Sequence, residues 1–339
     1  MSEIMIMVIF ADMMTLTQQM GEQAGSRDMT SVKVSVVIPV YNKKDYVEGC
    51  LRSVMTQDFD GYEVIAVDDG STDGSADVCE RMAHDYPRLR VIRQTNGGVT
   101  AARRHGVALA EGEYIMFVDA DDTLRPGSIG ILHKAIVATG ADEVVATFHD
   151  QHGRHHDNGF TGTANTAWMM RQLLGCKSHF PILWGVIFRK TMLEGCLSAP
   201  PIIREGEDIL MQVMFLMNDP KVVFIPDSVY NYVMGLPNNR RLNLPEQRVY
   251  DETLRQVLEP KWQLYKDLYT LRQLKTYENF IAARHFDVYD EYYYQARERL
   301  NGNIPVADRI AITLPPRVAY WLIRLRKSLL RLSLPGIHN

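Results

Sequence analysis

Short apolar runs alternate with amphipathic segments over the first half of the chain. The runs are rich in β-branched residues, as strands buried on both faces are. They predict strands at residues 33–39, 62–67, 89–92, 114–118 and 143–148. Helices are expected between them, after residue 45, at 75–85, after Gly97-Gly98 and after Pro126. Such alternation indicates βαβ units, and therefore an α/β fold with a mostly parallel sheet and flanking helices.

Polar side chains follow three of these strands at the point where each strand ends. They are Pro39-Val-Tyr-Asn42, Asp68-Asp69 and Asp119-Ala-Asp-Asp122. In parallel sheets, ligands bind outside the carboxyl ends of the strands. We therefore expect these groups to face one crevice.

The pattern loosens after residue 150. A carboxylate cluster at 205–208 precedes an amphipathic helix, followed by a strand at 222–225, an aromatic stretch at 230–232 and a helical, tyrosine-rich region at 245–300. We divide the chain into a flexible extension (1–30), an α/β domain (31–240, in halves 31–150 and 151–240), a helical region (241–304) and a basic amphipathic tail (305–339).

Composition excludes several classes of protein. With 46% hydrophobic and 23% charged residues in 339, the chain is typical of a globular protein rather than a disordered or collagen-like one. A net charge of -4 argues against a nucleic-acid-binding surface. The four cysteines contain no C-x-x-C pair, so we expect reduced thiols in the cytoplasm. The apolar run near the N-terminus is too short to span a bilayer.

Residues 69–80 resemble a calcium loop, with oxygen-bearing side chains at positions 1, 3, 5, 9 and 12 and Gly74 at position 6. An EF-hand needs a helix entering this loop, whereas the apolar pattern predicts a strand. Simple capping of the following helix is another alternative. Paired carboxylates at the end of a buried strand are better suited to holding a polar ligand.

Asp119-Ala120-Asp121-Asp122 is the second acidic motif. Alternation along an extended segment would place Asp119 and Asp121 on one side. Clustered carboxylates repel one another unless a cation lies between them, and oxygen ligands suit Mg²⁺ or Mn²⁺, which would in turn hold a diphosphate. A solvated acidic turn is the alternative. A third acidic pair, Glu207-Asp208, stands where helix caps are common.

These motifs, taken together, resemble family 2 glycosyltransferases with the GT-A fold. The matching strings are Val36-Val-Ile-Pro-Val-Tyr-Asn42, Val67-Asp-Asp-Gly-Ser-Thr-Asp73, Asn96-Gly-Gly98, Ala102-Arg103, Gly112-Glu-Tyr-Ile115 and Asp119-Ala-Asp-Asp122. The likeness continues more weakly to Glu207-Asp208 and covers roughly residues 33–235. It implies that 31–150 binds the nucleotide-sugar and that 151–240 holds the acceptor and the base.

The resemblance also implies a role for individual residues. Pro39, Tyr41 and Asn42 would line the nucleotide pocket. Asp69 would hydrogen-bond the base, expected to be uracil, and Arg103 would approach the nucleotide or its phosphates.

Three aspartates complete the implied site. Asp119 would lie near the ribose and the metal. Asp121 would bind the Mn²⁺ or Mg²⁺ that bridges the diphosphate, and Asp208 would be the catalytic base. The chain departs from the family at Arg104, where asparagine is usual, and in the loop after Tyr232. It also lacks the Q-x-x-R-W of processive polymerases.

We therefore expect an inverting glycosyltransferase that moves a sugar from a nucleotide-sugar, a UDP-sugar, to a hydroxyl of a glycan or lipid-linked acceptor. A metal-dependent nucleotidyl- or phosphotransferase is the enzymatic alternative, although the chain has no Gly-x-x-x-x-Gly-Lys phosphate loop. A non-catalytic nucleotide-sugar-binding protein is the other.

Three further features leave alternatives open. The tail from Arg317 to Arg331 has basic but no acidic residues and predicts peripheral contact with the inner membrane face, or a helix docked on the domain or a partner. The histidines between His149 and His156 indicate a solvated loop or a zinc site. Tyr292-Tyr293-Tyr294 fit a packed core or a surface on which sugars stack.

Overall fold

The structure is a computed structural model that describes residues 32–176, 180, 182–233, 243–286 and 314–333, with side chains as far as residue 326. The expected extension at residues 1–30 and the tyrosines at 292–294 lie outside the described residues. So do most of the loop after Tyr232 and the end of the basic tail.

Ten strands of the described chain form one sheet, in the order β3-β2-β1-β4-β9-β6-β10-β5, with β7 beside β6 and β8 beside β10. The strands are β1 (Val34–Val40), β2 (Tyr62–Asp68), β3 (Leu89–Arg93), β4 (Tyr114–Phe117), β5 (Thr123–Leu124), β6 (Glu143–Asp150), β7 (His155–His156), β8 (Gly162–Ala164), β9 (Val186–Arg189) and β10 (Val222–Tyr232). The five strands predicted in the first half are confirmed, with ends that differ by one or two residues.

The sheet is mixed, whereas a mostly parallel sheet was expected. Strands β3, β2, β1 and β4 are parallel, as are β6 and β10. Strand β9 lies between the two groups and is antiparallel to both β4 and β6. Two neighbouring strands are parallel only when the connection between them returns the chain to the same end of the sheet. The chain enters β9 from the opposite end, so β9 is antiparallel to its neighbours.

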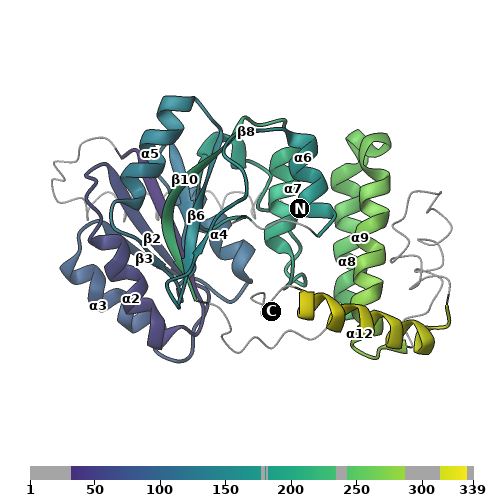
Figure 1. The fold of residues 1–339 in the computed structure, drawn as a ribbon. Coiled ribbons are helices and arrows are strands. Elements are labelled where there is room, and N and C mark those ends of the chain that lie inside the picture. The colour runs from purple at the N-terminus through teal and green to yellow at the C-terminus, as the bar shows by residue number, and fades with distance from the viewer. Residues whose placement is uncertain (1–31, 177–179, 181, 234–242, 287–313, 334–339) are drawn as a thin grey trace, which may run out of the picture.

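Helices cover both faces of the sheet (Figure 1). On one face lie α2 (Lys44–Met55), α3 (Ser75–Asp85) and α5 (Ser128–Thr139). On the other lie α4 (Val99–Leu109), α6 (Thr166–Leu174) and α7 (Glu207–Leu216), with the short helix η1 (Lys190–Leu193) after β9. Each face has its own cluster of buried apolar side chains, because the strands bury residues on both sides.

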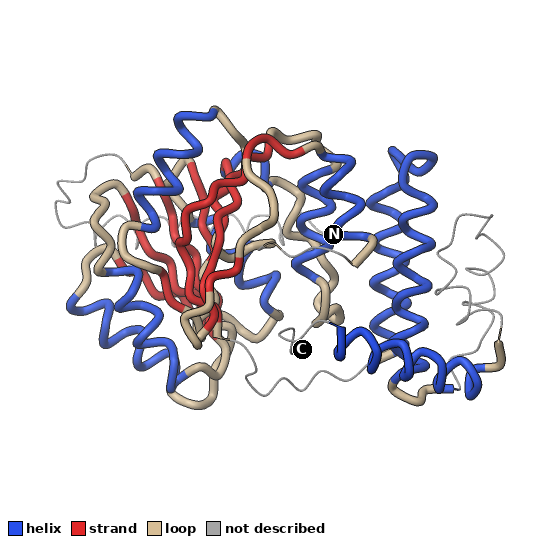
Figure 2. The backbone as a smooth tube through the Cα atoms, viewed as in Figure 1, coloured by secondary structure: helices blue, strands red, loops and turns tan. Residues whose placement is uncertain are grey.

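The described part of the predicted helical region contains α8 (Leu244–Leu258), η2 (Glu259–Lys261) and α9 (Trp262–Ala282). Figure 2 shows these helices at the end of the molecule remote from the edge strand β3. Tyr250, Leu254 and Tyr269 are buried in the same apolar cluster as α6 and α7. The α/β part and these helices therefore share one continuous core.

The basic tail forms helix α12 (Pro316–Ser333), which lies across one end of α8 and α9 (Figure 1). Ala319, Tyr320 and Ile323 are buried against α9. On the other side, Trp321 and Leu325 are 66% and 57% exposed. Among the described helices, none is both long enough and apolar enough to cross a bilayer.

Candidate functional site

The ends of β1, β2 and β4 open into one cavity of about 610 Å³, as the sequence predicted. Parallel pairing brings these three strand ends together, because β1 lies between the other two. Six of the predicted site residues line this cavity: Pro39, Tyr41, Asp69, Arg103, Asp119 and Asp121. The other two, Asn42 and Asp208, lie elsewhere.

Asn42 holds two strand ends together rather than lining the cavity. Its backbone adopts a left-handed conformation (φ 51°), and its Oδ1 accepts a hydrogen bond of 2.9 Å from the backbone N–H of Thr72. Its own N–H donates to Oγ of Ser71 at 3.0 Å. Asparagine tolerates this backbone region better than most residues, which suits it to the turn after β1.

Asp69 is buried and organises the glycine-containing loop before α4. Its Oδ1 and Oδ2 accept hydrogen bonds of 2.8 Å from the backbone N–H groups of Gly97 and Gly98. Its Oδ1 also accepts one of 2.7 Å from Nε2 of Gln94. One carboxylate thereby fixes the loop against the end of β2. Asp69 also lines the cavity. Its Oδ2 accepts only one of these hydrogen bonds, so this oxygen could accept the expected hydrogen bond from a base.

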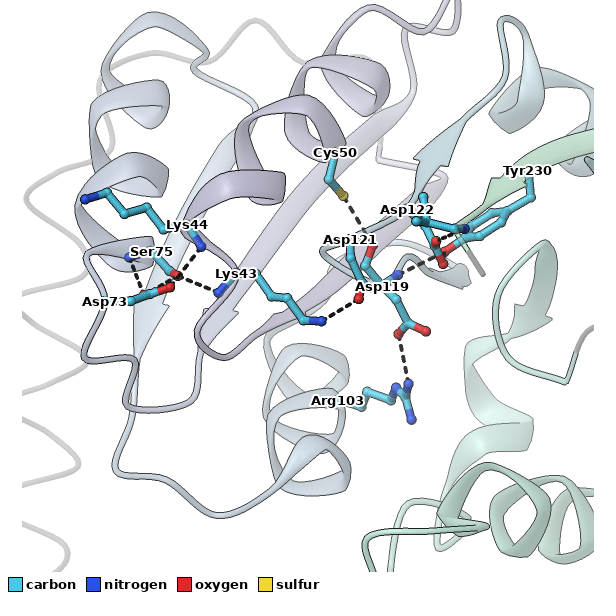
Figure 3. Close-up of polar contacts among 11 residues, drawn as sticks. Lys43, Lys44, Cys50, Asp73, Ser75, Arg103, Asp119, Asp121, Asp122 and Tyr230 are labelled. Carbon is cyan, nitrogen blue, oxygen red and sulfur yellow. Dashed lines mark hydrogen bonds and ion pairs between the residues drawn. The ribbon is translucent and has the colours of Figure 1, made fainter. Parts of the chain in front are cut away.

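The acidic motif after β4 is a hydrogen-bonded turn, so the expectation of an extended segment is wrong. The N–H of Asp122 donates to the carbonyl of Asp119 at 3.0 Å, which closes the turn. Asp119, Asp121 and Asp122 consequently point to three different partners (Figure 3). Arg103 contacts Asp119, Lys43 contacts Asp121 and Tyr230 contacts Asp122.

Asp119 and Asp121 each contact a cation from another element. Nη2 of Arg103, on α4, lies 3.0 Å from Oδ1 of Asp119, and the ammonium of Lys43 contacts Oδ2 of Asp121 (Figure 3). The Lys43 and Asp121 side chains are partly exposed in the cavity. Arg103, in contrast, is buried, with a side chain only 6% exposed.

Asp122 and Tyr230 hold the acidic turn in place through hydrogen bonds. The sequence analysis did not predict this role. The Tyr230 hydroxyl donates to Oδ2 of Asp122 at 3.0 Å and accepts from the N–H of Asp119 at the same distance. Burial raises the pKa of Asp122 to about 8. The aromatic stretch at 230–232 was visible in the sequence, but its proximity to the acidic turn depends on β10 pairing with β5.

Asp208 lies in the first turn of α7, beside a second cavity of about 440 Å³. The N–H of Ile209 donates to its Oδ1 at 2.7 Å. This second cavity and the first share Arg103, Asp119, Glu207 and the neighbouring Arg204. Asp208 is thus placed close to where the two cavities meet.

Glu207 joins the two acidic regions through Arg103, whose Nη1 lies 3.4 Å from Oε1 of Glu207. Burial and the neighbouring Asp208 raise the pKa of Glu207 to about 7, while Arg103 opposes that rise. One arginine therefore connects the turn after β4 to the start of α7.

A divalent metal ion at this site would take part of its coordination from the phosphate groups of a substrate. In the part of the chain that the structure describes, no cluster of three or more Asp, Glu, His or Cys side chains is arranged to hold a metal ion. Mg²⁺ is commonly bound by one or two carboxylates together with substrate phosphates. Asp121 offers such a carboxylate, and it already attracts the Lys43 cation.

The remaining sequence motifs have structural settings of their own. Strand β2, not a helix, enters the loop that resembled a calcium site. His149 lies on β6, and His155 and His156 form β7, which pairs with β6 as a hairpin rather than the expected loop. His156 lies 3.1 Å from Oδ2 of Asp150, a carboxylate whose pKa is lowered by this and other hydrogen bonds.

Sequence comparison gives clear relatives. A family model described as glycosyl transferase family 2 matches residues 35–194. An Escherichia coli (strain K12) protein named as an uncharacterized glycosyltransferase, YibD, is 43% identical over 251 residues, or 69% of this chain and 72% of that protein. Glycosyltransferase GlyA of Streptococcus pneumoniae is 30% identical over 59% of this chain. The chain spans only 30% of the length of GlyA and 39% of that of the related GlyG.

Structural comparison agrees with the fold. The crystal structure of residues 1–349 of S. aureus TarS matches with a TM-score of 0.55 at 20% identity, covering 91% of this chain and 94% of that one. The complex of the same protein with UDP-GlcNAc has a TM-score of 0.54 at 19% identity. At this level of identity the likeness concerns the fold, and it confirms the expected GT-A architecture.

Proposed function

The chain belongs to glycosyltransferase family 2, and we propose that it transfers a sugar from a UDP-sugar to a hydroxyl group of a glycan or lipid-linked acceptor, with inversion at the anomeric carbon. The observation that carries this proposal is the pair of joined cavities. One presents Tyr41, Asp69, Arg103 and Asp121, while the other presents Asp208. A donor and an acceptor can therefore meet beside one carboxylate.

The first cavity suits a nucleoside diphosphate. Tyr41 is 49% exposed at the end of β1, where its ring can pack against a base or ribose. Lys43, Arg103 and Arg204 bring cationic hydrogen-bond donors to the same cavity, beside the acidic residues Asp69, Asp119, Asp121 and Glu207. Such donors suit phosphate groups. The S. aureus TarS crystal structures include complexes with UDP and with UDP-GlcNAc, which supports a uridine donor.

We propose that Mn²⁺ or Mg²⁺ is held by Asp121, with Asp119 beside it. As a Lewis acid, the ion would stabilise the departing nucleoside diphosphate. The ammonium of Lys43 contacts Asp121, so Lys43 and the ion would compete for the same carboxylate. Arg103 keeps Asp119 in place from the other side.

Asp208 is the proposed general base. Its carboxylate takes the proton from the acceptor hydroxyl as that oxygen attacks the anomeric carbon, and the bond to the UDP oxygen breaks. Asp208 stands in the first turn of α7 and lines the second cavity, where an acceptor hydroxyl can approach it. Base assistance of this kind contributes about 10²–10⁴-fold to the rate.

The test compares Asp208→Asn with the unchanged chain in UDP release from UDP-glucose, UDP-galactose and UDP-N-acetylglucosamine with Mn²⁺, and in UDP binding by calorimetry. We expect unchanged UDP affinity and a loss of transfer of about 10²-fold or more. Asp267→Asn, at an exposed position on α9, is the matched control. Near-normal turnover by Asp208→Asn would remove the base assignment, and failure to bind any nucleotide-sugar would remove the proposed activity.

We also propose that α12 contacts the inner face of the membrane. Val318, Trp321 and Leu325 are exposed on the side of α12 that faces away from α9, near the cationic Arg317 and Arg324. An apolar face flanked by cations is typical of helices that lie at an anionic lipid surface.

Vesicle sedimentation tests this contact. The full chain should bind vesicles that contain phosphatidylglycerol, and Trp321→Ser with Leu325→Ser should reduce that binding. Phosphatidylcholine vesicles serve as the control for charge. Absence of binding to the anionic vesicles would exclude the membrane contact.

A further inference from the structure

One wall of the second cavity comes from the C-terminal helices, beyond the residues that the family model matches. Arg272, Lys275 and Asn279 lie on α9, and Tyr250 lies on α8. The family match ends at residue 194. This wall faces Asp208 and is therefore placed to select what binds beside the proposed base.

Arg272 is held firmly in that wall. Its Nη1 donates to the carbonyl of Leu173 at 3.3 Å and to Sγ of Cys176 at 3.6 Å. Its guanidinium carbon lies 5.0 Å from the centre of the Tyr250 ring. These contacts fix the plane of the guanidinium, and among the described residues its Nε has no hydrogen-bond acceptor.

No carboxylate of the described residues forms an ion pair with Arg272, although Asp251 and Asp208 lie near enough to stabilise its charge against the cost of burial. Its Nε is completely buried and makes no hydrogen bond, and the guanidinium forms no ion pair with any residue that the structure describes. Nε is therefore left with an unused donor, and a cationic donor forms its strongest hydrogen bonds with an anion. The neighbouring carboxyl of Asp251 accepts a hydrogen bond of 2.9 Å from Nε2 of Gln247.

The start of α7 lies directly against Arg272. A Cβ placed on Gly206 would be 2.9 Å from the Tyr250 ring and 3.6 Å from Nη2 of Arg272. Gly206 is the residue that precedes α7, and Asp208 is in the first turn of that helix. A group bound to Arg272 is therefore separated from the proposed base by no more than the first turn of a helix.

We propose that Arg272 binds an anionic group of the acceptor, a phosphate or a carboxylate, and so positions the neighbouring acceptor hydroxyl at Asp208. This inference rests on the proposed glycosyl transfer and adds the chemical class of the acceptor. The planar guanidinium can donate two parallel hydrogen bonds to either anion. Lys275, on the next turn of α9, adds positive charge to the same wall, although it lies 3.4 Å from Glu278.

The experiment uses the full chain with the first cavity filled by UDP and Mn²⁺, so that added anions do not bind there. Affinities are measured for matched pairs of probes that differ by an anionic group: glycerol 3-phosphate against glycerol, and glucuronate against glucose. We expect the anionic member of at least one pair to bind at least tenfold more tightly. The pair that shows this preference identifies phosphate or carboxylate as the preferred group.

Variants assign the preference to Arg272. Arg272→Met should abolish it, Arg272→Lys should retain part of it because the charge stays while the fork geometry is lost, and Lys266→Met, exposed on the same helix, should leave it intact. If Arg272→Met does not fold, as judged by its melting temperature, the affinities of Arg272→Lys for the two probe pairs test the proposal instead. Full retention of the preference in either folded variant would overturn the proposal.

Three further outcomes separate this inference from its premise. If UDP binds but neither anionic probe is preferred, the acceptor proposal fails and the glycosyltransferase proposal stands. If Arg272→Met lowers affinity for UDP-glucuronic acid but not for UDP-glucose, the anion belongs to the donor sugar and the acceptor proposal is overturned. If UDP itself does not bind, the proposed function is what fails.

Discussion

Nη2 of Arg103 lies 3.0 Å from Oδ1 of Asp119, and the same guanidinium reaches Glu207 through Nη1 at 3.4 Å. The two carboxylates stand on elements that are far apart in sequence, one after β4 and the other on α7. Arg103 therefore connects the first cavity to the helix that carries Asp208. The arrangement makes Arg103 a structural element of the site as well as a phosphate-binding candidate.

Arg103→Met should lower both stability and UDP affinity. Removing the buried cation leaves Asp119 and Glu207 without their partner, at a cost of about 3 kcal/mol in the free energy of unfolding. Urea unfolding and calorimetric titration with UDP measure the two effects. Arg104→Met, at the adjacent exposed position, should change neither, and an Arg103→Met variant as stable as the unchanged chain would contradict this account of the site.

Lys43→Met should strengthen Mn²⁺ binding at saturating UDP. Lys43 contacts the carboxylate proposed to hold the ion, and a partly exposed ion pair of this kind is worth up to about 1 kcal/mol. Its loss corresponds to an approximately fivefold gain in affinity, measured by the electron paramagnetic resonance signal of free Mn²⁺. Lys44→Met is the neighbouring control, and Asp121→Asn should abolish the binding. Weaker Mn²⁺ binding by Lys43→Met would show that the two cations do not compete.

Glu143→Gln should change how stability depends on pH. Glu143 is fully buried on β6 and accepts hydrogen bonds of 2.9 and 2.8 Å from Nε2 of Gln212, and burial raises its pKa to about 8. Between pH 4.5, the ordinary pKa of a glutamate, and about 8, the Glu143 carboxyl therefore keeps its proton in the folded chain and loses it in the unfolded chain. Its contribution to stability is complete below pH 4.5 and is lost as the pH rises towards 8.

A glutamine at position 143 cannot ionise, so its contribution is independent of pH. The melting temperature of Glu143→Gln should exceed that of the unchanged chain at pH 9 (about one unit above the folded pKa) and match it or fall below it at pH 5. Glu194→Gln, at an exposed position, should show no such crossover. Parallel pH profiles for Glu143→Gln and the unchanged chain would contradict the prediction.

Two glycine-to-alanine substitutions in helices should have opposite effects. Gly106, on α4, packs so closely on β1 that a Cβ would lie 2.4 Å from Cγ1 of Val37. Gly106→Ala should therefore destabilise the chain by about 1–3 kcal/mol through overpacking. Gly49, on the exposed side of α2, has open space around it, and Gly49→Ala should stabilise by about 0.5–1 kcal/mol. Denaturant unfolding distinguishes the two, and equal effects would disprove the packing argument.

The amino-acid sequence by itself determined the local elements of the first half of the chain. Apart from the two-residue strand β5, the strands from Val34 to Asp150 and the helices between them follow from the pattern of apolar residues. A strand buried on both faces gives a continuous apolar run, and an amphipathic helix repeats its apolar residues about every 3.6 positions. The same periodicity failed at β10, which was predicted only to residue 225. Pro226 and a shift in register beyond Phe224 interrupt its pattern, although the strand continues to Tyr232.

Only the tertiary structure decided how the site is assembled. Candidate site residues could be named from the sequence: Asp69, Arg103, Asp119, Asp121 and Asp208. The sequence did not predict that Asp69 fixes the Gly97-Gly98 loop, or that Arg103 contacts Glu207, 104 positions later. It also gave no sign that Arg272 lies against the start of α7. Such pairings depend on strand order and helix packing, and a contact between distant residues leaves no periodic signal in the chain that forms it.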